Sequence, residues 1–300
     1  MNKDFIKVGN RVLLSRKGLD YDLKSGHVYN LMYERYEGFG YLEEDGKLTT
    51  PNRIYSSGIE NELIDRVLTY FHDNNKSVGV LLEGLKGSGK TLTCKRIANK
   101  SELPIIVVDA MFPSVKLTEF FTKVTTDVVI IFDEVEKNRN WNSEDLLSFL
   151  DGIQDTCKKI VLMTCNKSTD LSNYLKDRCS RIRYKMHFDG LSNELIKEVV
   201  NDKISDKKLA NKLYNYISDN FSVKSYDNII EFINECLTFS NKNIEDLIKL
   251  MNIEVNDNMY NRDRKIESGE TEAVESVSKH ESNAGYDKCC EAMESCCCSC

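Results

Sequence analysis

The feature that most constrains this chain is a glycine-rich segment of eight residues that follows an apolar run. It fits the pattern G-x-x-x-x-G-K-S/T completely and consists of Gly84, Leu85, Lys86, Gly87, Ser88, Gly89, Lys90 and Thr91. Glycines there let the backbone turn so that successive N–H groups converge on phosphate oxygens, and a helix that begins near Lys90 adds the positive end of its dipole. The segment therefore predicts a strand, a phosphate-binding loop and a helix, with Lys90 reaching the β- and γ-phosphates of ATP and Thr91 binding Mg²⁺.

Two adjacent carboxylates, Asp133 and Glu134, end a second apolar run, VIIFDE. The carboxyl ends of parallel strands form the edge at which such sheets bind ligands. We expect Asp133 to hold the Mg²⁺ shell and Glu134 to orient and polarise the attacking water as a general base. The pair therefore favours a hydrolase over a protein that only binds nucleotide.

Five apolar runs alternate with amphipathic segments between residues 57 and 188: VGVLLE, PIIVVDA, DVVIIFDE, KIVLMTC and IRYKMHF. Strands that are apolar on both faces are typical of a parallel sheet covered by helices on both sides. We therefore predict an α/β fold with a five-stranded parallel sheet of the P-loop NTPase type.

The segments outside this core have different patterns. Residues 1–52 read as short strands separated by Gly, Asp and Asn, which predicts a small β-rich N-terminal domain such as a barrel. Residues 53–190 form the ATPase core, and residues 191–255 have helical periodicity and predict a helical lid. Residues 256–300 are too polar to bury a core, so we expect a disordered acidic tail with a cysteine-rich end.

The charge of the chain is unevenly distributed. The formal net charge is −7, and the tail alone holds ten acidic side chains against five basic ones. The nearly neutral remainder lacks the basic excess that binding to nucleic acid exploits, so nucleic acid is a less favoured partner than protein. Charges in the first ten residues and the lack of a long apolar run predict no membrane partner and a cytoplasmic location. The many Asn and Lys residues would suit a phage or viral gene, for which the compartment is the host cytoplasm.

The cysteines fall into two groups. Five are scattered singly, as small apolar fillers usually are, and do not suggest disulfides: Cys94, Cys157, Cys165, Cys179 and Cys236. The others crowd the last twelve residues, where metal binding, acylation, oxidation between chains and an unstructured tail all stay open.

Over residues 57–252 the sequence resembles the AAA+ superfamily of ATPases, and within it the AAA branch. Besides the two motifs above, the resemblance is carried by Asn166 at the end of KIVLMTCN, by the segment 142–152 that ends in Leu-Asp-Gly, and by Arg178-Cys179-Ser180-Arg181 before IRYKMHF. It implies that Asn166 is the sensor 1 residue, on a strand between those of the two motifs. It also implies that Arg178 and Arg181 are arginine fingers acting on a neighbour's ATP.

Some positions depart from the family pattern. Cys179-Ser180 replaces Pro-Gly, and Arg178-Cys179 is similar to the Ser-Arg-Cys of clamp loaders, so which arginine is the finger stays open. The lid has no clear sensor 2 arginine, and Lys224 is the nearest candidate.

Two further features concern a protein partner. Met111 and Phe112 lie where the family carries an aromatic pore loop, and Phe112 either grips a threaded polypeptide or packs in the core. In this family the N-terminal domain usually selects the substrate or adaptor. Its aromatic side chains either form a contact face or fill a core: Tyr29, Tyr33, Tyr36, Phe39 and Tyr41.

The resemblance thus implies a Mg²⁺-dependent ATPase that assembles as a homo-oligomer, with a hexameric ring favoured, and that remodels or unfolds a protein partner. One alternative is a clamp-loader-like or helicase-loader-like ATPase in DNA replication. Another is a scaffold whose assembly is switched by ATP.

Overall fold

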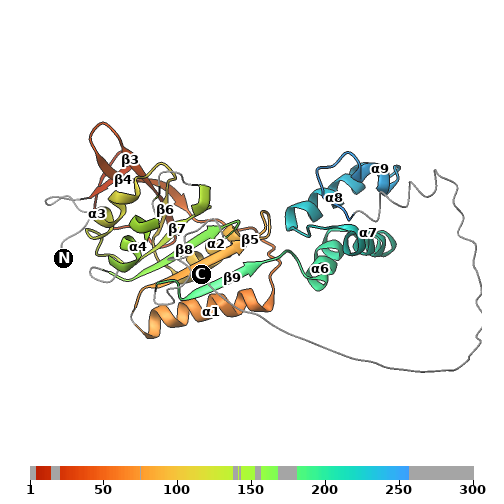
Figure 1. Ribbon diagram of the computed structural model, residues 1–300, viewed down its shortest axis with the longest axis horizontal. Coiled ribbons are helices and arrows are strands. Elements are labelled where there is room, and N and C mark those ends of the chain that lie inside the picture. Colours follow the sequence, from red (N-terminus) through yellow and green to blue (C-terminus); the bar gives the residue numbers. More distant parts are fainter. Residues whose placement is uncertain are drawn as a thin grey trace, which may run out of the picture. The chain divides into compact units, whose positions relative to one another are not determined.

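The strands that the structure describes form a single sheet (Figure 1). The computed structural model describes residues 5–14, 21–74, 76–137, 141, 143–152, 157–167 and 181–256. Within these ranges nine strands lie in the order β1-β2-β4-β3-β6-β7-β8-β5-β9. Arg178, Cys179 and Ser180 lie outside the described residues, and so does the predicted tail beyond Asn256.

The predicted five-stranded parallel sheet is confirmed. All four neighbouring pairs in the order β6-β7-β8-β5-β9 are parallel. The strand β8 lies between β5 and β7, so the residue that follows it, Asn166, lies between the two nucleotide motifs as predicted. The bounds of the strands are β5 Val78–Gly84, β6 Ile105–Val108, β7 Val128–Phe132, β8 Lys159–Cys165 and β9 Tyr184–Phe188.

Side chains of the parallel strands alternate between two hydrophobic cores. In β7, Val128, Ile130 and Phe132 enter one core, whereas Val129 and Ile131 enter the other. Because both faces are covered, every residue of β7 is buried. The helices α3 (Leu117–Phe121) and α4 (Ser143–Gly152) cover the first face, and α1 (Gly58–Asp73) and α2 (Lys90–Ser101) cover the second. Two short 3₁₀ helices, η1 (Ser114–Lys116) and η2 (Val135–Lys137), lie in the connections.

The N-terminal strands extend this sheet, and the barrel that we expected from residues 1–52 is not formed by the described residues. The strands β1 to β4 pair in antiparallel fashion, but β3 also pairs in parallel with β6, in a register that places Val28 opposite Ile105. Tyr29 and Leu31 therefore join the core beneath α3 and α4. The domain boundary at residue 52 stays a prediction. The bounds are β1 Phe5–Val8, β2 Arg11–Leu14, β3 His27–Glu34 and β4 Phe39–Lys47.

Phe112, one of the two pore-loop candidates, belongs to the core. Its side chain is fully buried, and its ring contacts those of Tyr33 and Phe120 edge-on. Its carbonyl oxygen accepts a hydrogen bond of 2.8 Å from the Trp141 indole N–H. A Cβ on Gly40 would lie only 2.8 Å from the Phe112 ring, so a glycine in β4 makes room for it. Phe112 therefore cannot grip a polypeptide in this conformation.

The N-terminal aromatic side chains divide between the core and the surface. Tyr29 and Tyr41 are buried, which agrees with a role in the core. Tyr36, at the turn between β3 and β4, is 99% exposed. Figure 1 shows this β3–β4 hairpin extending beyond the helices that cover the sheet.

The segment after β9 is helical, as predicted from its periodicity. Side chains cap the first three helices: Ser192 Oγ accepts from Leu195 N–H, Asp206 from Lys208 N–H, and Ser225 Oγ from Asn228 N–H. Their apolar faces bury a small core that includes the stacked rings of Tyr216 and Phe232, whose centroids are 5.4 Å apart. The bounds are α6 Asn193–Lys203, α7 Lys207–Asn220, α8 Tyr226–Thr238 and α9 Ile244–Ile248. None of the described helices is long and apolar enough to cross a membrane.

Candidate functional site

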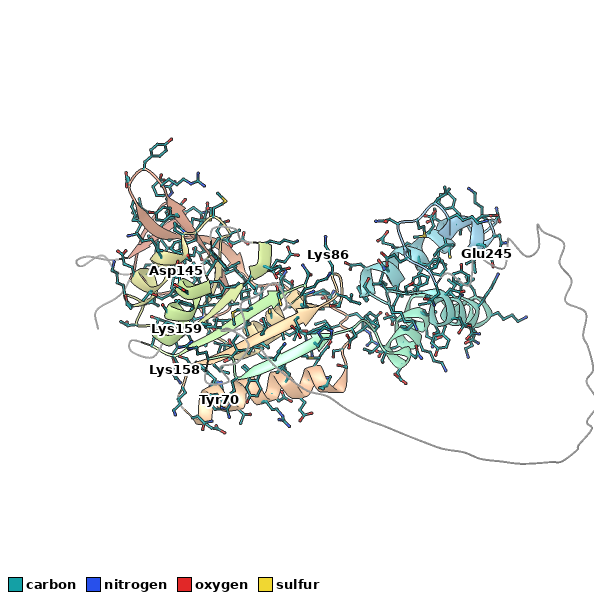
Figure 2. The ribbon with its side chains drawn as sticks, in the orientation of Figure 1. Tyr70, Lys86, Asp145, Lys158, Lys159 and Glu245 are labelled. Atoms are coloured by element: carbon teal, nitrogen blue, oxygen red, sulfur yellow. The ribbon has the colours of Figure 1, made fainter. Side chains whose placement is uncertain are left out.

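A cleft of about 720 Å³ opens at the carboxyl ends of the parallel strands. Its lining includes the glycine-rich loop, Asp133, Glu134 and Asn166, together with residues of the linker before α1 and of the helical segment. Figure 2 shows Lys86 of the loop at the end of the sheet away from Lys159, where β8 begins. The residues of the two nucleotide motifs and Asn166 therefore meet in one place.

Two glycines allow the loop to take its shape. Gly84 has φ 129°, and a Cβ there would collide with the carbonyl oxygen of Phe188 in β9. Gly87 has φ 71°, and its carbonyl oxygen accepts a hydrogen bond of 3.0 Å from Tyr226 N–H at the start of α8. Residues with a Cβ rarely adopt such φ values, so the glycines are a backbone requirement. The loop is thus attached to β9 on one side and to the helical segment on the other.

The helix α2 begins where the loop ends. Its N-cap is Gly89, which has no side chain to cap the N–H groups of the first turn. Uncapped N–H groups at a helix N-terminus, with the positive end of the helix dipole, favour an anion. This geometry suits a phosphate group.

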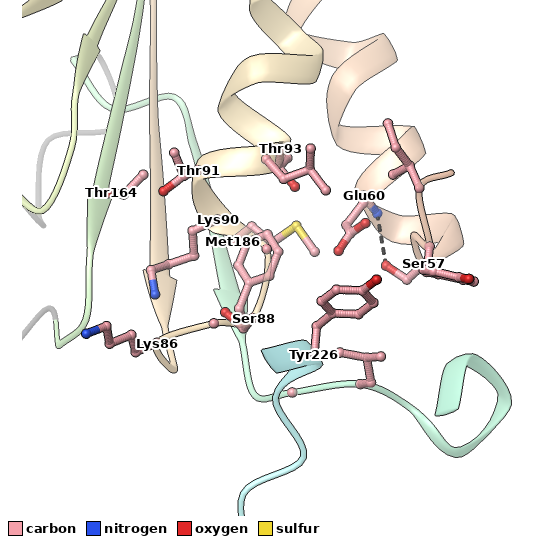
Figure 3. A pocket seen from close by; sticks show the side chains of 18 of the residues that line it. Ser57, Glu60, Lys86, Ser88, Lys90, Thr91, Thr93, Thr164, Met186 and Tyr226 are labelled. Atoms are coloured by element: carbon pink, nitrogen blue, oxygen red, sulfur yellow. Dashed lines mark hydrogen bonds between the residues drawn. The ribbon is translucent and has the colours of Figure 1, made fainter. Parts of the chain in front are cut away.

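Lys90 lies in the wall of the loop. Its side chain is buried, and its ammonium donates hydrogen bonds to the carbonyl oxygens of Gly84 at 2.8 Å and Leu85 at 2.7 Å, and to Asn166 Oδ1 at 3.2 Å. Burial lowers the pKa of Lys90, while nearby groups, including the three carboxylates of the site, oppose that shift. Figure 3 shows Lys86, Lys90 and Thr91 on one side of the pocket and Glu60 and Tyr226 on the other.

Thr91 and Asp133 face each other, as a shared metal ion requires. Thr91 Oγ1 donates to Asp133 Oδ1 at 3.1 Å. One hydroxyl and one carboxylate are few ligands for Mg²⁺, but this ion usually keeps several waters and takes further oxygens from phosphates. The donor set therefore fits Mg²⁺ brought in by a nucleotide.

Glu134 has a strained backbone and a charged neighbour. Its φ is 50°, in the left-handed region that non-glycine residues seldom adopt, and such strain often occurs at functional sites. Its Oε2 accepts a hydrogen bond of 2.6 Å from the Lys137 ammonium, and its Oε1 lies 3.4 Å from Asn166 Nδ2. Chiefly because of Lys137, the pKa of Glu134 is below its usual value, so its carboxylate is ionised at neutral pH.

Comparison with known proteins identifies the family to which this site belongs. The model of the ATPase family associated with various cellular activities (AAA) matches residues 80–189. The matched residues include the glycine-rich loop, Asp133, Glu134 and Asn166. Residues 80–189 therefore carry an AAA domain of the AAA+ ATPase superfamily.

The relatives of the AAA domain are distant. A Plasmodium falciparum protein described as a cell division cycle ATPase is 23% identical over 215 residues, which cover 61% of this chain. The match spans only 17% of that protein's length. The Thermotoga maritima RuvB Holliday junction branch migration motor aligns with a TM-score of 0.51 and 18% identity, covering 65% of this chain and 68% of RuvB. A RuvB variant aligns with a TM-score of 0.50. These structures share the fold.

Two residues of the AAA domain that the sequence reasoning missed connect the predicted ones. Thr164 Oγ1 donates to Asp133 Oδ1 at 2.6 Å and accepts from Glu134 N–H at 2.8 Å. Glu136 Oε1 accepts hydrogen bonds from the backbone and the side chain of Asn166. The signal for Thr164 was a hydroxyl near the end of a strand whose central residues are apolar. The signal for Glu136 was a third acid just after the strand end.

Arg181 is remote from the cleft of its own chain. Its carbonyl oxygen lies against Gly79, near the start of β5, whereas the phosphate loop follows the end of that strand. The five residue-to-residue steps from Gly79 to Gly84 span roughly 16 Å of extended strand. Any contact of Arg181 with ATP would therefore involve another copy of the chain, and this role stays a prediction, as does that of Arg178.

The side chain of Lys224, the candidate for sensor 2, forms a hydrogen bond away from the cleft. Its ammonium donates to the carbonyl oxygen of Ser218 at 2.9 Å, and it does not line the cleft. The side chain of the helical segment that approaches the phosphate loop is instead Asp227, whose carboxylate lies next to Gly87.

The far half of the cleft joins the linker before α1 to the helical segment. Arg53 Nη2 donates to Glu198 Oε1 at 2.7 Å, and the Tyr55 hydroxyl donates to Asp202. The rings of Tyr55 and Tyr226 face each other with centroids 5.8 Å apart. Apolar side chains complete this half: Ile54, Ile59, Met186, Leu191 and Leu195. An apolar and aromatic wall of this kind suits a flat, poorly hydrated group such as a nucleobase.

A capping box shapes the wall beside α1. The Ser57 hydroxyl accepts from Glu60 N–H, the contact drawn as a dashed line in Figure 3. The Glu60 carboxylate lies 3.6 Å from the Arg96 guanidinium, and both side chains are largely buried. Burial raises the pKa of Glu60, and Arg96 counteracts part of that rise.

Proposed function

We propose that this protein is a Mg²⁺-dependent ATPase that works as an oligomeric ring and remodels a protein partner. The observation that carries the proposal is the convergence of Lys90, the Thr91–Asp133 pair, Glu134 and Asn166 at one end of a single cleft. These groups come from α2 and from the ends of two neighbouring strands. Together they supply phosphate binding, a metal site and a base.

Each group has a distinct part in hydrolysis. The loop N–H groups and the Lys90 ammonium bind the phosphates, and Lys90 exchanges its bonds to Gly84 and Leu85 for phosphate oxygens. The Glu134 carboxylate takes a proton from the attacking water, and the Asn166 amide orients that water. Thr91 and Asp133 would hold Mg²⁺, which when bound would act as a Lewis acid and neutralise charge on the phosphates.

The nucleoside lies in the far half of the cleft in this proposal. Tyr55 and Tyr226 give the base aromatic contacts, and Ile54 and Leu191 exclude water from it. Because the linker and the helical segment both contact the base, binding of ATP holds them together across the phosphate loop.

The proposal that several copies of the chain assemble rests on the position of the arginine-finger segment. Since Arg181 lies near the opposite end of β5 from the phosphate loop, a finger from this segment serves a neighbour's ATP only if copies of the chain associate. In a closed ring, every ATP site has one neighbouring subunit that can supply the arginine. Six copies are favoured by the family resemblance. The exposed Tyr36 on the β3–β4 hairpin offers a contact point for the protein partner.

A DNA-acting motor is the second candidate function. It is favoured by the likeness in fold to a branch migration motor and by the Arg178-Cys179 pair, and disfavoured by the nearly neutral charge of residues 1–255. An ATP-switched scaffold is a third, which the ionised Glu134 beside Asn166 disfavours.

One experiment tests the proposal and separates the candidates. Steady-state ATP turnover with Mg²⁺ is measured for the wild type and Glu134→Gln, and particle mass is recorded with and without ATP. We expect turnover that falls about 10²- to 10⁴-fold in the variant and a multimer that forms with ATP. Turnover raised by DNA would favour the motor on DNA, and tight ATP binding without turnover would favour the scaffold. A particle mass that corresponds to a monomer both with and without ATP would contradict the proposed ring.

A further inference from the structure

We infer that Glu136 is a positioning residue, which fixes the amide of Asn166 so that this amide can serve Glu134 and the attacking water. The inference rests on the proposed hydrolysis of ATP. It concerns a residue outside the two nucleotide motifs, and it gives that residue a role in the orientation of a catalytic group.

One oxygen of Glu136 holds Asn166 at two points. Glu136 Oε1 accepts from the Asn166 backbone N–H at 3.0 Å and from Nδ2 of the same residue at 2.6 Å. Hydrogen bonds to a charged acceptor are stronger than neutral ones. The two bonds therefore restrain both the end of β8 and the side chain that it presents.

The turn that carries Glu136 is itself fixed. Glu136 lies in η2, whose first residue, Val135, is buried in the core beneath α4. The turn is closed by a hydrogen bond of 2.9 Å from Lys137 N–H to the Glu134 carbonyl oxygen. Glu136 is thus attached to the same short segment as Glu134, and it links that segment to the neighbouring strand.

The chemistry of its neighbours leaves the Asn166 amide only one orientation. Its Oδ1 accepts from the Lys90 ammonium at 3.2 Å, and its Nδ2 faces Glu136. An ammonium can only donate and a carboxylate can only accept, so a flipped amide would place donor against donor and acceptor against acceptor. Lys90 and Glu136 together therefore determine which end of the amide faces Glu134.

The amide has two hydrogens to share between two carboxylates. Glu136 takes one at 2.6 Å, and Glu134 Oε1 is within reach of Nδ2 at 3.4 Å. Without Glu136, the amide nitrogen would be free to turn fully toward Glu134 or away from it. Because a misplacement of about 1 Å can reduce turnover about 100-fold, we expect the constraint to affect the rate more than the binding of ATP.

The burial of one carboxylate oxygen of Glu136 separates this role from that of a solvated surface acid. Its second oxygen, Oε2, is buried and has no hydrogen-bond partner among the described residues. A buried carboxylate oxygen without a partner destabilises the fold, so a role in packing alone would favour an apolar residue at this position. The two bonds to Asn166 explain why an acid is present at this position, whereas the stability of the fold does not explain it.

The test compares Glu136→Ala and Glu136→Gln with the wild type. Gln keeps an acceptor oxygen in the same place, whereas Ala removes it. We expect Glu136→Ala to lower kcat about 10- to 100-fold with little change in KM, and Glu136→Gln to recover most of the loss. Glu119→Ala, which removes an exposed acid of α3, is the matched control and should leave kcat unchanged.

A double variant separates positioning from general damage. If Glu136 acts through Asn166, Glu136→Ala should cost little further kcat in a protein that already carries Asn166→Ala. Additive losses in the double variant would overturn the inference, and so would a Glu136→Ala variant that keeps the wild-type kcat.

Hydrogen exchange gives a readout that does not need turnover. We expect the Asn166 backbone N–H to exchange faster in Glu136→Ala than in Glu119→Ala or the wild type. Unchanged exchange would show that the contact is absent and would overturn the inference. A wild type without ATP turnover would instead overturn the proposed function, so the two failures are distinct. Should Glu136→Ala fail to fold, Glu136→Asp, which withdraws the oxygen by one methylene, takes its place in both measurements.

Discussion

The phosphate end and the nucleoside end of the cleft are held together in different ways. At the phosphate end, bonds such as those from Lys90 to Gly84 and from Thr164 to Asp133 join neighbouring strands and turns and are at least partly buried. At the nucleoside end, Arg53 forms an ion pair with Glu198, and the two side chains are 58% and 46% exposed. Exposed pairs contribute about 0 to 1 kcal/mol each. The phosphate end is therefore preformed, whereas the proposed base site can rearrange at little cost.

Among tests of this comparison between the two ends, the largest effect is expected at the buried lysine of the phosphate end. Lys90→Ala should weaken ATP binding about 10- to 100-fold, because charged hydrogen bonds contribute about 1.5 to 3 kcal/mol. Titration calorimetry with ATP and Mg²⁺ measures the change. Lys100→Ala removes an exposed lysine from the same helix and should leave binding unchanged. Equal binding by both variants would show that the phosphate end is not built around Lys90.

The next effect tests whether the phosphate end is as rigid as its contacts indicate. Thr164→Val keeps the shape of the side chain but removes the hydroxyl that joins Asp133 to Glu134 N–H. We expect a loss of about 1 to 3 kcal/mol in the free energy of unfolding, because a partly buried N–H loses its acceptor. Denaturant unfolding measures it, with Thr69→Val on the exposed side of α1 as control. A loss no greater than that of the control would refute the bridging role.

A smaller effect is expected at the nucleoside end. Tyr226→Ala removes a ring that faces Tyr55, and such contacts contribute about 0.5 to 1.5 kcal/mol. KM for ATP should rise roughly 2- to 10-fold while kcat stays constant. Tyr36→Ala, which changes a 99% exposed ring outside the cleft, should alter neither quantity. A fall in kcat for Tyr226→Ala would contradict the separation of the two ends.

The smallest effect concerns the pH dependence of turnover. The Lys137 ammonium is the main reason that the pKa of Glu134 is below its usual value. A base with a lowered pKa stays ionised to lower pH, so Lys137→Ala should raise the pKa of Glu134 and move the acid limb of the kcat profile to higher pH. Lys123→Ala, which frees the exposed Glu119, should leave the limb in place. A limb that moves to lower pH would exclude Glu134 as the group that titrates.

The sequence predicted the parts of the site that depend on neighbours along the chain. The conformation of the loop from Gly84 to Thr91 depends on its own glycines, and the carboxylates of Asp133 and Glu134 directly follow a strand end. The position of Asn166 also follows from a strand end, once the strand order is known. Thr164 and Glu136 could not be predicted in the same way, because each acts through residues that follow the end of a neighbouring strand.

The N-terminal strands show where sequence patterns stop being informative. The pattern in residues 1–52 predicted strands, and strands are present. The prediction of a barrel was wrong, because β3 pairs with β6 of the parallel sheet. Alternation of apolar and polar residues within a strand does not show which other strand it will pair with. The ring of Phe112 illustrates the same limit, since only the packing of Gly40 and Phe120 around it places it in the core.

The sequence by itself determined the α/β class, the phosphate loop and the acids that end β7, since these depend on local periodicity and backbone conformation. The tertiary structure alone decided the union of the N-terminal strands with the parallel sheet, the bonds from Glu136 and Thr164, and the facing rings of Tyr55 and Tyr226. The physical reason is that hydrogen bonds between strands and contacts between side chains join residues far apart in the sequence, and their partners are selected by the packing of the whole chain.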